Sequence, residues 1–299
     1  MTGSVHFGAS TWTYPGWEGV VYRDVSAYGR RFKADSLSEY VSSGYFDCVG
    51  IDNMFYGFPS DQKLALLKQH LPAGFPCVVK VPRELTYPHF THQFGPRGAS
   101  GTSNPRFLDP FIAREGLFRP FREALSQNEG VFVLQFPPMP HRNEFREFWF
   151  EQLDYFLGEL HGEWPVAVEV RNPEFLGPDY FAMLRDHGAA HVFQVWTGMP
   201  LPHEVLKKHP SAITCAPFVA CRALVCPGVA YKDAVERYSP YSRLVEPNLR
   251  VRKSILAVVE EAIERNLSVY TTVNNRLEGC APLTIQALKN EMAVEKQER

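Results

Sequence analysis

The sequence has no long apolar run, no marked excess of charge and no paired-cysteine motif. Its 299 residues carry a net charge of -2, whereas proteins that bind a nucleic-acid backbone usually have a basic excess or stripe. No apolar stretch approaches the ~18 residues of a membrane span, and the N-terminus has no signal-peptide pattern. The six cysteines form no CxxC pair and no zinc-type spacing. We therefore expect a soluble cytoplasmic protein with buried free thiols and no membrane contact.

The chain also lacks internal repeats and low-complexity linkers that would divide it. Hydrophobic residues make up 45% and charged residues 21% of the sequence, which is ordinary for a globular protein. We therefore expect a single domain over residues 1–299, with a mobile tail at residues 292–299.

Eight segments have the apolar composition of buried β-strands, and several are nearly continuous apolar runs, as in parallel sheets. These strand candidates are residues 5–10, 46–51, 77–81, 131–136, 166–170, 191–196, 218–225 and 268–273. The clearest helix candidates are residues 60–69, 110–126, 144–160, 178–186, 249–265 and 283–292. Most strands are followed by a helix, which predicts an α/β fold with a parallel sheet.

Eight such units favour a single closed TIM-type (β/α)8 barrel, regular or irregular, with a long loop after the third strand. A doubly wound open sheet is the alternative. That fold usually has a Gly-rich phosphate turn after its first strand, and this sequence has none there. The longest irregular segment, residues 82–104, follows the third strand. Loops of this length are usually functional or mobile, and as a lid it would close over the barrel mouth.

The segment of residues 166–172, which begins with the fifth strand candidate, carries two charges in a run that otherwise has the pattern of a buried strand. Residues two apart share one face of a strand, so Glu169 and Arg171 point the same way as Ala167, while Val168 points the other way. Burying both charges is costly unless each is paired or hydrogen-bonded. The segment therefore builds either a structural ion pair or a functional site.

Polar and aromatic side chains follow six of the eight strand candidates. In a (β/α)8 barrel the catalytic groups come from the carboxyl ends of the strands and from the loops after them. We therefore expect the site there, with Glu169, Lys80 and Arg171 as its catalytic residues. The residues expected to contact a substrate are Trp12, Tyr14, Asp52, Tyr56, Gln135, Asn172, Asn274 and Asn275.

Each candidate also has a structural explanation. Lys80 can be an internal counter-ion of Glu169 rather than a reactive amine, and Asp52 can cap a helix or a turn. Gln135 can satisfy backbone groups. The asparagines after the eighth strand can be ordinary turn residues, and the aromatic side chains can be core packing.

Short motifs at the strand ends share their order and spacing with a known family. They are Gly8-Ala9-Ser10 with Trp12 and Trp17, Phe55-Tyr56 with Pro59, Val79-Lys80-Val81-Pro82-Arg83 with Thr86, Gln135-Phe136-Pro137-Pro138, Glu169-Val170-Arg171-Asn172, and Asn274-Asn275 with Gly279 and Ala281. Over nearly its whole length the chain resembles the YecE-like proteins, catalogued as domain of unknown function 72. The resemblance implies a TIM-type barrel with its polar residues at the strand ends, and it implies no particular reaction.

The sequence departs from the family pattern at two strands. The second strand tends to read Glu-x-Asn-Ser/Thr in relatives, and here Gly50, Asp52 and Asn53 stand in those places. The seventh strand has no clear Arg-x-His-Gly, and only Arg222 is matched to it. The resemblance therefore carries over a fold and the position of a site, but no substrate.

Three functions remain open from the sequence. We expect an enzyme acting on a small polar or anionic metabolite that bears phosphate or carboxylate, with Glu169 as general base or acid and Lys80 and Arg171 as anion contacts. A non-catalytic ligand-binding or regulatory barrel is the alternative. A metal-dependent nucleic-acid hydrolase is the third hypothesis, disfavoured by the near-neutral charge. His89 and His92 would need a further ligand from elsewhere to bind a metal, so we expect no metal and no cofactor.

Overall fold

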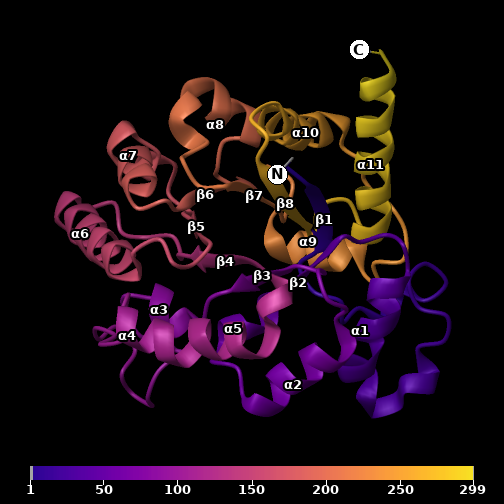
Figure 1. The fold of residues 1–299 in the computed structure, drawn as a ribbon, viewed down its shortest axis with the longest axis horizontal. Helices are drawn as coiled ribbons and strands as arrows, with labels where there is room; N and C mark the ends of the chain where they lie inside the picture. The colour runs from indigo at the N-terminus through magenta and orange to yellow at the C-terminus, as the bar shows by residue number, and fades with distance from the viewer. Residues whose placement is uncertain (1–2, 299) are drawn as a thin grey trace.

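The computed structural model describes residues 3–298, with side chains up to residue 294, and forms a closed barrel of eight parallel strands (Figure 1). Neighbouring strands pair in chain order, and β8 pairs with β1 to close the sheet. The strands are β1 (Val5–Ala9), β2 (Cys48–Ile51), β3 (Cys77–Lys80), β4 (Glu129–Gln135), β5 (Val166–Glu169), β6 (Ala190–Val195), β7 (Phe218–Ala223) and β8 (Ser268–Val273). The predicted TIM-type barrel is confirmed, because each of the eight strands pairs with two neighbours, whereas an open sheet has two edge strands with one neighbour each.

Helices surround the strands (Figure 1). They are α1 (Phe32–Ser42), α2 (Asp61–His70), α3 (Arg83–Thr86), α4 (Pro110–Ala113), α5 (Arg119–Leu125), α6 (Asn143–Leu160), α7 (Pro178–Asp186), α8 (Pro202–Lys208), α9 (Tyr231–Tyr238), α10 (Leu249–Glu264) and α11 (Ala281–Glu298). Every predicted helix is present, and a π-helical turn divides the one predicted at 110–126 into α4 and α5.

Four helices were not predicted, and one is longer than predicted. The unpredicted ones are α1, α3, α8 and α9, of which α1 buries Phe32, Leu37 and Tyr40 but has serine and aspartate between them, residues with low helix propensity. Helix α11 continues through residues 292–298, which we expected to be a mobile tail. That segment has no Gly or Pro to end a helix. Arg299 lies outside the described residues.

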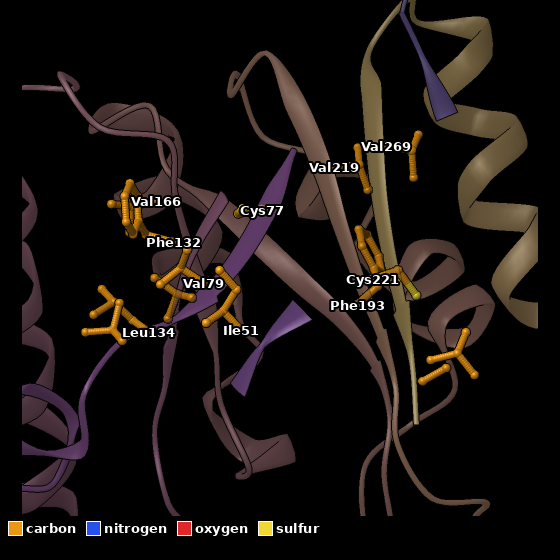
Figure 2. Packing of buried hydrophobic residues seen from close by; sticks show 14 of the residues in the cluster. Ile51, Cys77, Val79, Phe132, Leu134, Val166, Phe193, Val219, Cys221 and Val269 are labelled. Atoms are coloured by element: carbon orange, nitrogen blue, oxygen red, sulfur yellow. The ribbon is translucent and has the colours of Figure 1, made fainter. Parts of the chain in front are cut away.

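The strands carry two separate layers of apolar side chains. The inner layer fills the barrel with mostly small residues: Cys48, Val78, Val131, Val133, Ala167, Ala190, Val192, Ala216, Phe218 and Ala220. The larger outer layer packs the strands against the helices, and Figure 2 shows some of its strand side chains, such as Phe132, Phe193 and Val219. Val168 belongs to the outer layer and Ala167 to the inner one, which confirms the predicted alternation along β5.

Strands β1 and β2 approach each other closely at Gly8, which pairs with Cys48. A Cβ atom at position 8 would lie 2.3 Å from the Cys48 carbonyl oxygen and 2.7 Å from its Sγ. A larger residue would push the strands apart, so this glycine serves the packing of the barrel.

The segment after β3 is more ordered than an irregular loop. Helix α3 begins it, and an isolated β-bridge further on pairs His89 with Ser103. The side-chain amide of Asn104 donates to the carbonyl oxygens of Glu84 and Tyr87, at 2.8 and 2.7 Å. These hydrogen bonds tie the two ends of the loop together.

The cysteines are free thiols, as expected, and five of the six are buried. Cys215 is exposed, contrary to the prediction, because it lies in the connection before β7 rather than within a strand. In the part of the chain that the structure describes, we find no helix with the length and apolarity to cross a membrane.

Candidate active site

Polar side chains replace apolar ones towards the carboxyl end of the barrel's inner face. Inner positions change from Val78 to Lys80 on β3 and from Ala220 to Arg222 on β7. The same change from apolar to polar occurs from Val133 to Gln135 on β4 and from Ala167 to Glu169 on β5. Because residues two apart share a face, these polar groups lie directly above the apolar filling. The inside of the barrel is therefore apolar below and charged at its carboxyl end.

A cavity of about 630 Å³ opens at this charged end, within the size range of small-molecule sites. Its walls come from the strand ends and the loops after them. Seven of the residues predicted for the site line it: Tyr14, Asp52, Tyr56, Lys80, Gln135, Arg171 and Asn274. Tyr87 and Gln93 of the long loop after β3 also line it.

A chain of four charged side chains lies at the cavity, three of them lining it and the fourth, Glu169, buried beneath them. Glu169 forms ion pairs with Arg171 and with Arg222, the latter at 2.6 Å between Oε2 and Nη1. Arg222 Nη2 donates to both carboxylate oxygens of Asp52, at 2.8 and 2.7 Å. Arg222 thus bridges the two carboxylates, whereas Arg171 is paired with Glu169 alone.

The pairing fixes the charge state of this chain. Burial alone would raise the pKa of Glu169, but the charges of Arg171 and Arg222 outweigh it and hold that pKa below its ordinary value. Burial opposes the charge of Arg222 as well, yet Asp52 and Glu169 together raise its pKa. Burial lowers the pKa of Arg171 to about 10. All three side chains are therefore ionised near neutral pH.

Lys80 differs from its charged neighbours because its ammonium group has no ionic partner in direct contact. Nζ forms no hydrogen bond or ion pair with the described residues, and it lies 3.7 Å from the centroid of the Phe55 ring. Burial lowers the pKa of Lys80 to about 8, although Asp52 opposes the shift. Repulsion from Arg222 and Arg171 contributes to the lowering, and Glu169 opposes it. A substantial fraction of this amine is therefore neutral in mildly basic solution.

Besides Lys80, three fully buried donor groups on residues that line the cavity have no partner among the described residues. They are Arg171 Nη1, Arg276 Nε and Ser10 Oγ, which are buried and form no hydrogen bond with the described residues. An unpaired buried donor costs roughly 1–3 kcal/mol, and buried polar groups in proteins are normally satisfied by protein, water or an ion. These donors are therefore enclosed and unsatisfied on residues that line the cavity, where a hydrogen-bond acceptor in contact with them would satisfy them.

Aromatic rings hold two of the cationic groups in place. The Arg171 guanidinium carbon lies 4.0 Å from the centroid of the Trp196 ring, and that of Arg276 lies 4.5 Å from the Tyr231 ring. Such stacking is a favourable cation–π geometry. Asn274 Oδ1 also accepts a hydrogen bond from Arg276 Nη1 at 3.0 Å. Both guanidinium groups are thus oriented before any ligand binds.

Three of the predicted contact residues do not reach the cavity. Trp12 is buried and donates its indole N–H to a backbone carbonyl of α1 at 3.1 Å. The Asn172 amide bonds to the backbone N–H and carbonyl of Met139, at 2.7 and 3.1 Å. Asn275 Oδ1 accepts from the indole of Trp17 at 3.0 Å. These side chains hold loops in position, because their hydrogen-bonding groups face the protein interior.

Glu169 also lies beneath the cavity wall rather than in it, with none of its surface exposed. The sequence left open whether Glu169 and Arg171 form a structural ion pair or belong to a site, and the structure places the two residues differently. Glu169 is an enclosed ion-pair partner, and Arg171 lines the cavity.

Two arginines of the site were not among the predicted site residues. Arg222 lines the cavity from β7, and Arg276 lines it from the turn after β8. A signal for Arg222 exists in the sequence, because alternation places it on the same face as Ala220. Arg276 directly follows the two asparagines that we did select.

No metal centre is evident in the part of the chain with described side chains, since no three His, Cys, Asp or Glu groups gather where they could hold an ion. His89 of the long loop instead lies beside Phe145, with 6.2 Å between ring centroids.

The fold and the site define a class: a (β/α)8 barrel with a cationic cavity at the carboxyl ends of its strands. The chain belongs to the DUF72 family, described as "Protein of unknown function DUF72", whose family profile matches residues 6–299. This membership confirms the resemblance noted in the sequence. No protein with curated annotation matches the sequence closely enough to show relatedness.

Solved structures of this family have the same fold. A DUF72 family protein from Thermotoga maritima is 19% identical and superimposes with a TM-score of 0.63, covering 97% of this chain and 99% of the other. A DUF72 family protein from Enterococcus faecalis is 15% identical, with a TM-score of 0.59 and coverage of 96% and 98%. At these identities the likeness shows the fold alone.

Proposed function

We propose that this protein is an enzyme that acts on a small metabolite bearing a phosphate or a carboxylate. The observation that carries the proposal is the excess of positive charge and free donors at the cavity. Lys80, Arg171, Arg222 and Arg276 outnumber the carboxylates of Asp52 and Glu169, and two of these arginines have an unpartnered nitrogen. An anionic group would neutralise the charge and satisfy both donors.

Each side chain has a separate role in this proposal. Arg171 and Arg276 hold the anionic group, because they have free donors and stack on aromatic rings. Gln135 lines the same cavity and offers an amide for a hydroxyl or carbonyl of the substrate. Lys80 supplies the reactive amine, because it alone among the cations has neither an ion pair nor a hydrogen bond to the described residues.

Glu169 takes a different role from the general base or acid that the sequence suggested. A carboxylate enclosed by two guanidinium groups, with a lowered pKa, is a weak base and does not face the cavity. We assign it to positioning: it fixes Arg171 and Arg222. Its replacement by glutamine should therefore disturb the arrangement of the arginines and not a proton transfer.

Calorimetric titration with inorganic phosphate tests the anion site. Phosphate should bind to the wild-type protein, and Arg171→Gln should bind it about tenfold more weakly, equal to ~1.4 kcal/mol. Arg146→Gln is the matched control, because Arg146 also lies over an aromatic ring, at 4.6 Å from the Phe150 centroid, but on α6 outside the cavity. Equal affinities of the two variants would contradict the proposed site.

A non-catalytic ligand-binding barrel is the second candidate, and the enclosure of Glu169 favours it. The two candidates differ in the fate of the ligand. Phosphorylated and carboxylated metabolites are incubated with the protein and followed by nuclear magnetic resonance. An enzyme converts one of them, and Lys80→Met abolishes the conversion while some phosphate affinity remains. A binding protein retains its ligand unchanged, with or without Lys80.

A further inference from the structure

The cavity places a nucleophilic amine close to an anion site, and this combination suits a particular substrate class. Lys80 lies at the carboxyl end of β3, partly exposed, with its amine over the Phe55 ring. Arg171 lines the same cavity and has a free nitrogen. We propose that Lys80 forms a Schiff base with an aldehyde or ketone whose phosphate or carboxylate is held by Arg171 and Arg276. This inference rests on the proposed anion site and names the chemistry done there.

The surroundings of Lys80 favour its neutral, nucleophilic form. A lysine paired to a carboxylate is held as ammonium, which cannot attack a carbonyl, and Lys80 has no such pair with the described residues. The nearby guanidinium groups of Arg171 and Arg222 both disfavour a further positive charge. These carboxylate-paired arginines stay charged, so the lysine is the group that releases its proton.

The reaction balances without any further reagent. The neutral amine attacks the carbonyl carbon, a C–N bond forms, and the proton lost from nitrogen is gained by oxygen to give a carbinolamine. With one proton from solvent, the oxygen then leaves as water and a protonated imine remains. Overall, an ammonium and a carbonyl become an iminium and water, so the positive charge is conserved. Asp52 lines the same cavity and raises the pKa of Lys80, so its carboxylate also stabilises the iminium.

Borohydride reduction tests the inference, because it converts an imine into a stable secondary amine. The protein is incubated with dihydroxyacetone phosphate, with pyruvate, or with uncharged dihydroxyacetone, reduced, and digested for peptide mapping by mass spectrometry. We expect an adduct on Lys80 with at least one anionic probe and about tenfold less with the uncharged one. Labelling by the phosphate but not by pyruvate identifies a phosphate site, and the reverse identifies a carboxylate site.

Variants separate Lys80 from other amines. Lys80→Met should give no site-specific adduct. Lys63→Met is the matched control and should label fully, because burial lowers the pKa of Lys63 as well, but this residue is on α2 away from the cavity. The rate of trapping in the wild-type protein should rise as the pH is raised through about 8, the pKa of Lys80. Mapping and the pH profile use wild-type protein, so they hold even where a variant does not fold.

Failure of the inference is distinguishable from failure of the proposed function. If calorimetry shows that a carbonyl probe competes with phosphate, but no adduct forms on Lys80, the Schiff base is overturned and the anion site stands. Adducts spread over exposed lysines at equal levels for charged and uncharged probes overturn it as well. If neither phosphate nor the anionic probes bind, the proposed function falls together with the inference.

Discussion

Two groups of buried charges in this barrel differ in how completely their hydrogen bonds are used. The first, which we call the closed cluster, consists of Arg252 and Glu278. Glu278 is fully buried and accepts hydrogen bonds from Arg252, from the Thr284 hydroxyl at 2.9 Å and from the Asn248 backbone N–H at 2.6 Å. Arg252 also bonds to Glu291 at 3.1 Å. Each nitrogen of the Arg252 guanidinium therefore has an acceptor.

The second group, which we call the open cluster, consists of Asp52, Lys80, Glu169, Arg171 and Arg222. Its carboxylates hold the arginines, as in the closed cluster. However, one nitrogen of Arg171 has no partner, and Lys80 has no ion pair with the described residues. The two clusters teach that burial of charge does not by itself mark a site. The proposed site rests instead on donors left without a partner beside a cavity.

The largest effect is expected in the closed cluster. Glu278→Gln should lower the free energy of unfolding by about 3–5 kcal/mol, because Arg252 is then buried without its main counter-charge. Chemical denaturation at pH 7 measures the loss, and phosphate affinity should not change. A loss smaller than that of Glu169→Gln would reverse the comparison.

In the open cluster, Glu169→Gln should lower the free energy of unfolding by about 1.5–3 kcal/mol. The loss is smaller because Arg222 keeps Asp52 and Arg171 lines the cavity. The folded pKa of Glu169 lies below its ordinary 4.5, so its contribution is present above that pH and is lost as the pH falls. Denaturation curves of the variant and the wild type should therefore lie closer together at about pH 4 than at pH 7. A constant gap would show that the ionised carboxylate is not the cause.

Anion binding distinguishes the two clusters next. Arg276→Gln should weaken phosphate binding by about tenfold, or ~1.4 kcal/mol, because it removes the free Nε and a positive charge from the cavity. Arg250→Gln is the control, since this arginine is exposed and pairs with Glu204 outside the cavity. If both variants bind phosphate equally, charge in general and not the open cluster determines the affinity.

The smallest effect concerns Lys80. Its folded pKa of about 8 lies below the ordinary 10.5, so the folded state resists the charged form, and this destabilisation is fully present below pH 8 and disappears as the pH rises towards 10.5. Lys80→Met should therefore raise the free energy of unfolding by about 1 kcal/mol at pH 7 and by less at higher pH. The effect is small because the amine is partly exposed and keeps some of its hydration. Lys68→Met, on the exposed side of α2, is the control and should not raise the free energy of unfolding at pH 7.

Much of the fold could be predicted because buried strands have a strong sequence signal. All eight strands lie within the predicted apolar segments or within two residues of them. Helix α7 has its predicted bounds, whereas α9 was missed. Its eight residues are mostly polar and bury only Ala234 and Tyr238, too few for a clear periodic pattern.

The site was predictable where a residue stands at the end of its own strand. Lys80, Gln135 and Asn274 were found in this way, and the structure brings them together around one cavity. The pairing of Asp52 with Arg222 could not be predicted from strand ends, because the two residues are 170 positions apart in the chain. The inward roles of Trp12 and Asn275 also depend on contacts with distant segments, which strand-end position does not reveal.

The sequence by itself determined that Glu169 shares the inner face of β5 with Ala167, because the alternation of side chains along a strand is a local property of the backbone. Arg171 follows two residues later, just beyond the end of this strand. Only closure of the barrel decided that the side chains of Glu169 and Arg171 have different surroundings. It brought Arg222 of β7 against Glu169 and enclosed that carboxylate, while the Arg171 guanidinium came to line the cavity with a free nitrogen. Whether a buried charge finds all its partners depends on segments far apart in the chain, and these meet only in the folded protein.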